Sequence, residues 1–203
     1  MDETSVKEKI FKAVREALIE KDMDIIVESD TVELVEGASE ASISFADKFV
    51  HKGGGFLFCE RSKDLLDGVV ELFQNSDLAD ILCLNDDLSE VLAACNINHL
   101  RTVSKDQKID FVVMQADALI AESGSVVVSF NNEFENIVLS SGAVLVLFAR
   151  TDQVVNRYAD VPKIVNSREH SAAFSYVHLI EKPATKNKLE FPKQTNIFLR
   201  YVK

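Results

Sequence analysis

The chain has 203 residues, of which 47% are apolar and 27% charged, an ordinary composition for a soluble globular protein. At roughly 150 residues per domain, this length predicts one α/β-sized domain with a small N-terminal attachment. The 22 Lys and Arg residues and 33 Asp and Glu residues give a net charge of −11. This charge argues against binding to nucleic acid or to an anionic membrane surface. It still allows a small anionic metabolite to bind in a locally positive pocket.

The N-terminal segment is predicted to form an amphipathic helix. Its apolar residues recur at helical spacing and form one stripe, which includes Val6, Ile10, Val14, Ala17 and Leu18. Ser5 can cap this helix, with Glu8 three residues later as in a capping box. Residues 1–38 are therefore predicted to be an N-terminal helical extension. Its apolar stripe packs on the domain or covers it as a lid, and a connection or short strand follows around Thr31–Val35.

Residues 39–203 are predicted to form an α/β domain, because strand-like and helix-like segments alternate from Ser39 onward. Helices are predicted at Ser39–Lys52, Ser62–Gln74 and Asp87–Cys95, and short buried strands at Phe56–Cys59 and Ile81–Leu84. Gly53–Gly55 ends the first of these helices. Strands separated by helices of about 10–14 residues are typical of βαβ units in a mainly parallel sheet.

The second half of the domain is predicted to contain more closely spaced strands. These strands are expected at Ala118–Ala121, Ser125–Phe130, Ile137–Leu139, Val144–Phe148, Tyr176–Ile180 and Asn196–Val202, with a helix near Asp152–Tyr158. Gly124 and Gly142 lie in the intervening turns and can adopt the positive φ that such turns need. The predicted fold class is a three-layer, Rossmann-like α/β fold with a mixed sheet and helices on both faces.

The sequence predicts neither a membrane span nor a secretory signal. The longest apolar stretch, Gly142–Ala149, is far shorter than the 18 or so residues of a spanning helix, and Met1–Ser5 lacks the basic start of a signal peptide. The three cysteines (Cys59, Cys83 and Cys95) form no C-x-x-C pair, so no disulfide framework and no iron–sulfur or zinc site made by this chain alone is expected. We expect a reduced, cytoplasmic protein, with no cofactor and no metal.

The clearest candidate for chemistry is the turn that contains Glu122. Standard nucleotide-binding, hydrolase and metalloprotease motifs are absent, and Gly53–Gly55 follows a helix rather than a strand, which favours a helix stop over a phosphate cradle. Glu122 is followed by Ser123 and Gly124 at the end of an apolar strand, where open α/β sheets place ligands. Partial burial there would raise the pKa of this carboxylate and make it a nucleophile or base. The alternative is a hairpin turn with exposed polar residues.

This segment resembles the signature of the LUD (lactate-utilisation) domain family. The family signature has an acidic residue, then A-E-S/T-G-S/T, then a run of hydrophobic residues. This chain matches it in order and spacing at Asp117, Ala121, Glu122, Ser123, Gly124 and Ser125. The resemblance covers roughly Phe56–Thr151. It implies the NagB/RpiA/CoA-transferase-like fold and a role in oxidising L-lactate to pyruvate together with separately encoded iron–sulfur proteins. It also implies that Asp117, Ser123, Gly124 and Ser125 bind a ligand. Some CoA transferases use a glutamate in a similar turn as nucleophile, and this analogy makes Glu122 the catalytic candidate.

Two further signatures of that family are missing. Members commonly continue with G-P-S-x-T-A-D-I-E and later G-x-H-G-P, whereas Val165–Phe174 and Glu181–Lys186 match neither. The chain is therefore predicted to be a divergent member, with a different ligand site or none.

Three other polar residues are candidates for ligand binding. Arg150 follows a strand and either binds a ligand carboxylate or phosphate or pairs with Asp152 or Asp160. Ser140 and Ser141 either donate hydrogen bonds to an anion or form a plain turn. Ordinary surface or core roles are expected for the histidines, which show no metal-binding spacing (His51, His99, His170 and His178).

Three functions remain open, and whether the chain is an enzyme is undecided. The first, which we favour, is an accessory subunit in lactate oxidation whose redox centre lies in iron–sulfur partner proteins. The second is a separate enzyme or binder of acyl-CoA or phosphosugar type that uses Glu122. The third is a degenerate domain kept for homo-oligomerisation or for other protein contacts.

Overall fold

The protein is described here by a computed structural model that covers residues 38–74, 80–104, 107–131, 138, 142–162, 174–184 and 192–202. The predicted N-terminal helix and the segment at Thr31–Val35 lie outside the described residues, as do Ser140 and Ser141. Most of the divergent region at Val165–Phe174 also lies outside them.

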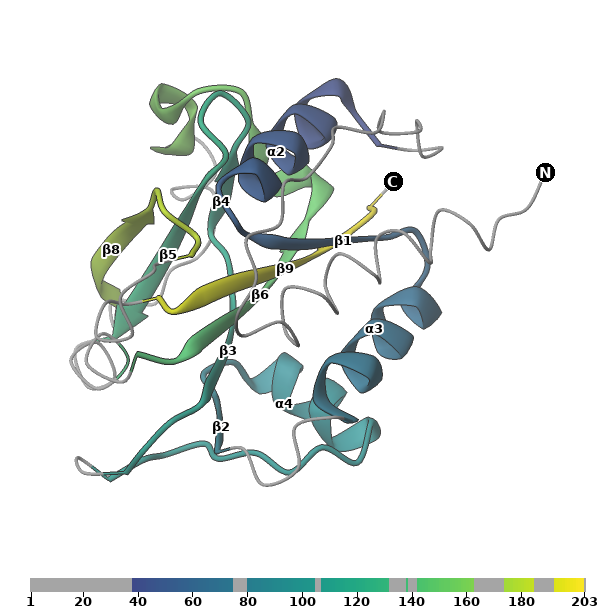
Figure 1. The fold of residues 1–203 in the computed structure, drawn as a ribbon, viewed down its shortest axis with the longest axis vertical. Helices are drawn as coiled ribbons and strands as arrows, with labels where there is room; N and C mark the ends of the chain where they lie inside the picture. Colours follow the sequence, from purple (N-terminus) through teal and green to yellow (C-terminus); the bar gives the residue numbers. More distant parts are fainter. Residues whose placement is uncertain are drawn as a thin grey trace.

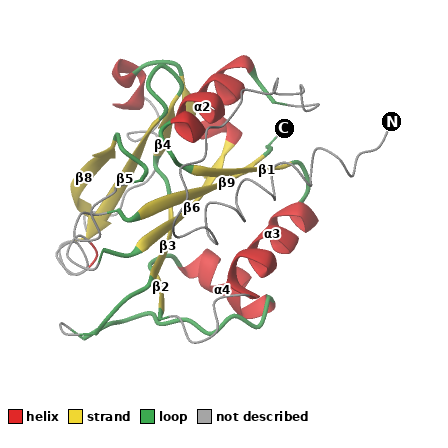
Figure 2. Cartoon of the chain, viewed as in Figure 1, coloured by secondary structure: helices red, strands yellow, loops and turns green. Residues whose placement is uncertain are grey.

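The centre of the fold is a five-stranded sheet in which all neighbouring strands are parallel (Figures 1 and 2). Its strand order is β1 (Gly55–Cys59), β9 (Gln194–Arg200), β6 (Val144–Arg150), β3 (Phe111–Gln115) and β2 (Ile81–Cys83). Apart from β9, which begins with Gln194, Thr195 and Asn196, these strands are nearly continuous apolar runs, as expected for a parallel sheet that is covered on both faces. The predicted layered α/β fold is confirmed.

A second sheet of four strands lies against the first. Its order is β7 (Val154–Val155), β4 (Ala118–Ile120), β5 (Ser125–Asn131) and β8 (Phe174–Ile180). β4 pairs in parallel with β7 and antiparallel with β5, and β5 pairs antiparallel with β8. The mixed pairing expected from the sequence is therefore found in this smaller sheet.

The α-helices α2 (Glu40–His51), α3 (Ser62–Gln74) and α4 (Asp86–Ala94) complete the layers among the described residues. They closely match the three predicted helices. Ser39 caps α2 by accepting a hydrogen bond from the backbone N–H of Ser42, and Asn85 caps α4 in the same way. No helix in the described ranges has both the length and the apolar character needed to cross a membrane.

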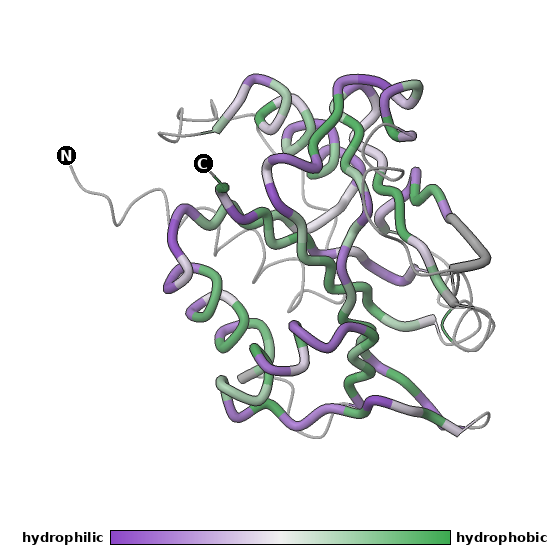
Figure 3. Tube along the Cα trace, turned by 180° about the vertical axis from the view of Figure 1, so that it is seen from behind, coloured by the Kyte–Doolittle hydropathy of each residue, from purple (hydrophilic) through white to green (hydrophobic). Residues whose placement is uncertain are grey.

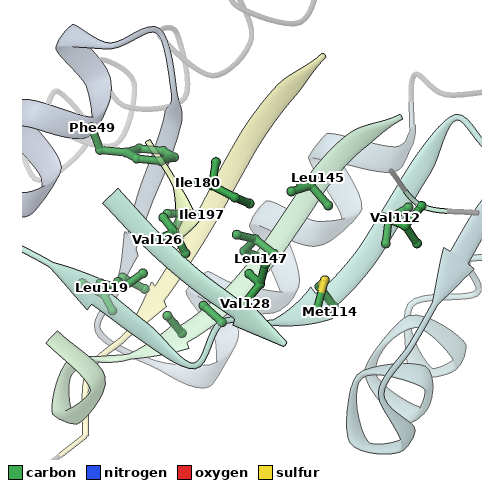
Figure 4. Close-up of a cluster of buried hydrophobic side chains, with 14 of the residues drawn as sticks. Phe49, Val112, Met114, Leu119, Val126, Val128, Leu145, Leu147, Ile180 and Ile197 are labelled. Carbon is green, nitrogen blue, oxygen red and sulfur yellow. The ribbon is translucent and has the colours of Figure 1, made fainter. Parts of the chain in front are cut away.

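Of the three apolar clusters among the described residues, two lie between the layers. One lies between the two sheets and includes Met114, Val126 and Leu147, with Phe49 of α2 at its margin (Figure 4). The other lies between the five-stranded sheet and helices α3 and α4, and includes Val69 and Leu92. Helices thus pack on both faces of the main sheet, α3 and α4 on one side and α2 beside the second sheet on the other. Hydrophilic and hydrophobic residues alternate along α3, whereas the central strands are largely hydrophobic (Figure 3).

Three local predictions need correction. β3 was not anticipated as a strand of its own. Of the strand expected at Ile137–Leu139, the structure describes only Val138, which is helical and buried. The helix expected near Asp152–Tyr158 is replaced by two 3-10 turns, Thr151–Gln153 and Tyr158–Asp160, on either side of β7. The β-branched pair in β7 favours a strand, and pairing with β4 supplies the hydrogen bonds.

Candidate functional site

The Glu122 turn, residues 121–124, joins β4 to β5 and has a tightly defined backbone. The N–H groups of Ser123 and Gly124 both donate to the carbonyl of Ile120, at 3.3 and 2.8 Å. Gly124 has a φ of +64°, so the predicted positive-φ turn is confirmed. A Cβ atom on Gly124 would lie 2.8 Å from the Cβ of Lys48 and 2.8 Å from the backbone nitrogen of Phe49. Only glycine allows the turn to approach helix α2 so closely.

Helix α2 and strand β7 hold the turn from two sides. The Nζ of Lys48 donates to the carbonyls of Ala121 and Glu122, at 3.0 and 3.1 Å, and Ser44 donates to the Ala121 carbonyl at 3.4 Å. On the other side, the N–H groups of Ala121 and Glu122 donate to the carbonyls of Val155 and Asn156, at 2.8 and 2.9 Å. All four N–H groups of the turn and the carbonyls of Ala121 and Glu122 are therefore hydrogen-bonded, which fixes the backbone in position.

The side chain of Glu122 projects from this fixed backbone into solvent. It is exposed, and its carboxylate makes no hydrogen bond or ion pair with any residue that the structure describes. The partial burial expected for this carboxylate is not found. The turn therefore presents an accessible negative charge in a defined place.

Asp117 does not join Glu122 in one site. Asp117 is buried at the start of β4, where its N–H donates to the carbonyl of Val127 at 2.8 Å, whereas Glu122 lies beyond the other end of that strand. At about 3.3 Å per residue, the five steps between them correspond to roughly 16 Å. Ser125 is buried opposite Ile120 on the face of the second sheet that points away from the main sheet, and its hydroxyl has no hydrogen-bond partner among the described residues. Of the predicted site residues, the structure brings together Glu122, Ser123 and Gly124.

A buried glutamine, Gln153, fixes the point where two strands pass from one sheet to the other. Its side-chain nitrogen donates to the carbonyls of Ala116 and Asp117, and its side-chain oxygen accepts a 2.7 Å hydrogen bond from the N–H of Arg150. β3 and β6 pair in the main sheet, and their continuations β4 and β7 pair again in the second sheet. The sequence reasoning missed Gln153; its only signal was a polar residue at the start of a β-branched pair.

Arg150 lies at the carboxyl edge of the main sheet and forms the expected ion pair with Asp152. Its Nε and one terminal nitrogen lie 3.0 and 2.7 Å from the two carboxylate oxygens of Asp152. Both side chains are about half exposed, so this pair contributes little to stability.

A second arginine, Arg200, lies beside Arg150 on the neighbouring parallel strand. The two residues are register partners, and Phe148 and Phe198, each two residues earlier, stack with ring centroids 5.2 Å apart. Because side chains alternate along a strand, both arginines point to the face covered by α3 and α4. Arg200 is exposed and forms no ion pair or hydrogen bond with the described residues. A repeated F-x-R pattern at the end of both strands was the signal for this pair.

Two of the three cysteines, Cys59 and Cys83, are separated by the width of the main sheet. Cys59 lies on β1 and Cys83 on β2, which are its opposite edges. Four strand spacings of about 4.8 Å place them roughly 19 Å apart, too far to bind one iron–sulfur cluster. Burial raises the pKa of Cys59 to about 12, and the nearby Asp64 adds to this shift. The described ranges contain no group of His, Cys, Asp and Glu residues arranged to hold a metal ion.

Comparison with known proteins identifies the fold but not the family. No family model matches the chain, and no curated protein matches it. Among solved structures, the chain is similar to a DUF162 family protein from Deinococcus radiodurans, with a TM-score of 0.61 and 12% sequence identity, over 79% of this chain and 96% of that chain. The predicted layered α/β fold is thereby confirmed, with a parallel five-stranded sheet at its centre.

Proposed function

We propose that the chain is an accessory subunit in the oxidation of L-lactate to pyruvate, and that it binds separate iron–sulfur proteins through the Glu122 turn. The single observation that carries this proposal is the combination of a tightly packed turn, in which every N–H group from Ala121 to Gly124 is hydrogen-bonded, with an exposed carboxylate that has no partner among the described residues. DUF162 corresponds to the LUD domain family, so the similarity of fold is consistent with the resemblance at residues 117–125.

The positions of the cysteines support the proposal that the electron acceptor lies in the partner proteins and not in this chain. Oxidation of lactate removes two electrons, and they must pass to an acceptor. Because Cys59 and Cys83 are buried at opposite edges of the sheet, this chain does not gather a cluster-ligand set from its own cysteines. Iron–sulfur partners would supply the electron acceptor, and this chain would position or stabilise them.

The Glu122 turn suits an interaction surface. A fixed backbone reduces the entropy lost on binding, and a charge at the rim of an interface improves the rate and specificity of association with a basic surface. The acidic net charge of −11 also favours a basic partner surface.

Growth on L-lactate tests this function. A strain that lacks this gene should grow poorly with L-lactate as sole carbon source, and the wild-type gene should restore growth. Glu122→Lys should restore growth less well, because it reverses the charge at the proposed contact. Glu181→Lys is the matched control, since Glu181 is also exposed but follows β8. Normal growth of the deletion strain, or full complementation by Glu122→Lys, would contradict the proposal.

Binding of a small anionic metabolite is a second candidate function, and the pair Arg150–Arg200 is the observation that favours it. Two guanidinium groups in register at the carboxyl edge of a parallel sheet can bind a carboxylate or phosphate, and that of Arg200 has no ion pair with the part of the chain that the structure describes. A thermal-shift screen with lactate, pyruvate, phosphosugars and acyl-CoA thioesters tests it. A stabilising ligand should lose its effect in Arg200→Ala and keep it in Arg157→Ala, in which an exposed arginine elsewhere is removed. No stabilising ligand, or equal effects in both variants, would exclude this candidate.

A further inference from the structure

A serine–histidine pair lies outside the Glu122 turn. The Oγ of Ser89, on α4, is 2.6 Å from the Nε2 of His99, and the Nδ1 of His99 is 3.0 Å from the carbonyl oxygen of Ile97. A carbonyl oxygen only accepts hydrogen bonds, so Nδ1 carries the proton. In the neutral imidazole, Nε2 is then the acceptor, and the hydroxyl of Ser89 donates to it. This is the arrangement in which histidine removes a proton from a serine nucleophile.

The backbone on both sides of His99 is fixed. Asn96 ends α4 with a φ of +56°, and the N–H groups of Asn96 and Ile97 donate to the carbonyls of Ala93 and Leu92, which forms a Schellman motif. Leu100 then bridges to β2, donating to the carbonyl of Ile81 at 2.7 Å and accepting from the N–H of Cys83 at 2.9 Å. His99 is held between these two anchors and is therefore oriented before any ligand binds.

The pair lies where parallel α/β sheets commonly place reactive groups. α4 begins directly after the carboxyl end of β2, and Ser89 is in the first turn of this helix. Side chains on a helix lean toward its N-terminus, so Ser89 lies over the turn that contains Asp86. The N–H groups of Asp86 and Asp87 have no acceptor within the helix, and Arg101 contacts the Asn85 carbonyl and the Asp86 carboxylate. These N–H groups lie at the same end of α4 as Ser89, where the helix dipole favours negative charge.

We propose that Ser89 and His99 form a nucleophile–base pair that hydrolyses small acyl esters. Oγ of Ser89 forms a bond to the carbonyl carbon of the ester, and its proton passes to Nε2 of His99. The bond from that carbon to the alcohol oxygen breaks, and the alcohol leaves with the proton from His99. Water then attacks the acyl carbon and gives a proton to His99; the bond to Oγ breaks, Oγ regains the proton, and the free acid leaves.

Charge around the pair selects neutral substrates. Asp87 and Glu90 are exposed on α4 on either side of Ser89, and the carboxylate of Asp86 is already paired with Arg101. Like charges disfavour a polyphosphate group at this point. We therefore expect short-chain neutral esters to react and acyl-CoA thioesters to react poorly, which separates this site from the Glu122 turn and from the Arg150–Arg200 pair.

Hydrolysis of p-nitrophenyl acetate by the full chain, together with labelling by a fluorophosphonate, tests the proposal. Wild type should be acetylated and labelled at Ser89, as located by peptide mass spectrometry. Ser89→Ala and His99→Gln should each lower the rate by about a hundredfold or more. Ser104→Ala is the matched control, because Ser104 is exposed and lies apart from the pair, and it should keep the wild-type rate.

Thermal midpoints show whether each variant is folded, and alanine at position 89 keeps a good helix former in α4. Labelling of Ser89 that is lost in folded His99→Gln would establish His99 as the base. Three results would overturn the proposal: no labelling of the folded wild type, labelling at another residue only, or ester hydrolysis that folded Ser89→Ala retains.

Discussion

The Cβ of Lys48 lies 2.8 Å from the position that a Cβ on Gly124 would occupy. This approach brings α2 against the Glu122 turn and lets the ammonium group of Lys48 reach the carbonyls of Ala121 and Glu122. The geometry of the turn therefore depends on a residue more than seventy positions earlier in the chain.

Gly124→Ala should lower the free energy of unfolding by about 2–5 kcal/mol. The left-handed conformation costs a non-glycine residue about 1–2 kcal/mol, and forced contact with α2 adds about 1–3 kcal/mol. Urea unfolding of both proteins measures this difference. Ser123→Ala, one residue earlier, should change stability by less than about 0.5 kcal/mol. A Gly124→Ala protein as stable as wild type would show that the turn is not packed as described.

Lys48→Met should lower stability by about 1 kcal/mol and speed hydrogen exchange at the amides of the turn. The apolar part of the side chain is kept, while the two hydrogen bonds to backbone carbonyls are lost at a partly exposed position. Exchange followed by mass spectrometry should show the increase in peptides that contain Gly124 and no increase in those from β2. Unchanged exchange at the turn would count against the role given to Lys48.

Gln153→Leu should lower the free energy of unfolding by about 2–4 kcal/mol. Leucine is of similar size but leaves the carbonyl of Ala116 and the N–H of Arg150 without their partner. Asp152→Asn is the control, since it weakens a half-exposed ion pair and should cost no more than about 1 kcal/mol. Equal stability of Gln153→Leu and wild type in a denaturant titration would refute this account of the junction.

Cys59 should be unreactive in the native protein, and its burial should make stability depend on pH in alkaline solution. The native thiol has its pKa raised to about 12 from 9.0, so it stays protonated where the unfolded thiol ionises. The stabilisation is complete below pH 9 and is lost as the pH rises toward 12. Iodoacetamide at pH 8 should modify Cys95 first, because it is the least buried of the three. Rapid native modification of Cys59 would contradict its placement in the core.

Local patterns in the sequence were sufficient for much of the fold. Helix α3 was predicted at its observed bounds, because its apolar residues recur at helical spacing over thirteen residues. Gly124 was expected to have positive φ from its position between two strand-like runs. Predicting β7 required knowledge of its partner, since two residues carry almost no periodicity and pairing with β4 decides their conformation.

The residue pairs that sequence reasoning missed depend on how the chain folds back on itself, which local sequence patterns do not show. Arg200 becomes notable only because β9 inserts between β6 and β1, which places it beside Arg150. Ser89 and His99 are ten residues apart, and only the chain reversal at Asn96 brings them within hydrogen-bond distance. Conversely, Asp117 and Glu122 are close in sequence but are held apart by the extended strand between them.

Lactate-dependent electron transfer in a reconstituted system tests the proposed function most directly. The purified chain would be mixed with the separately encoded iron–sulfur proteins and L-lactate, and reduction of a dye would be followed. We predict that dye reduction requires this chain. Glu122→Lys should raise the concentration of chain that gives a half-maximal rate, whereas Glu181→Lys should leave that concentration unchanged. An equal rate of dye reduction without this chain would contradict the accessory role.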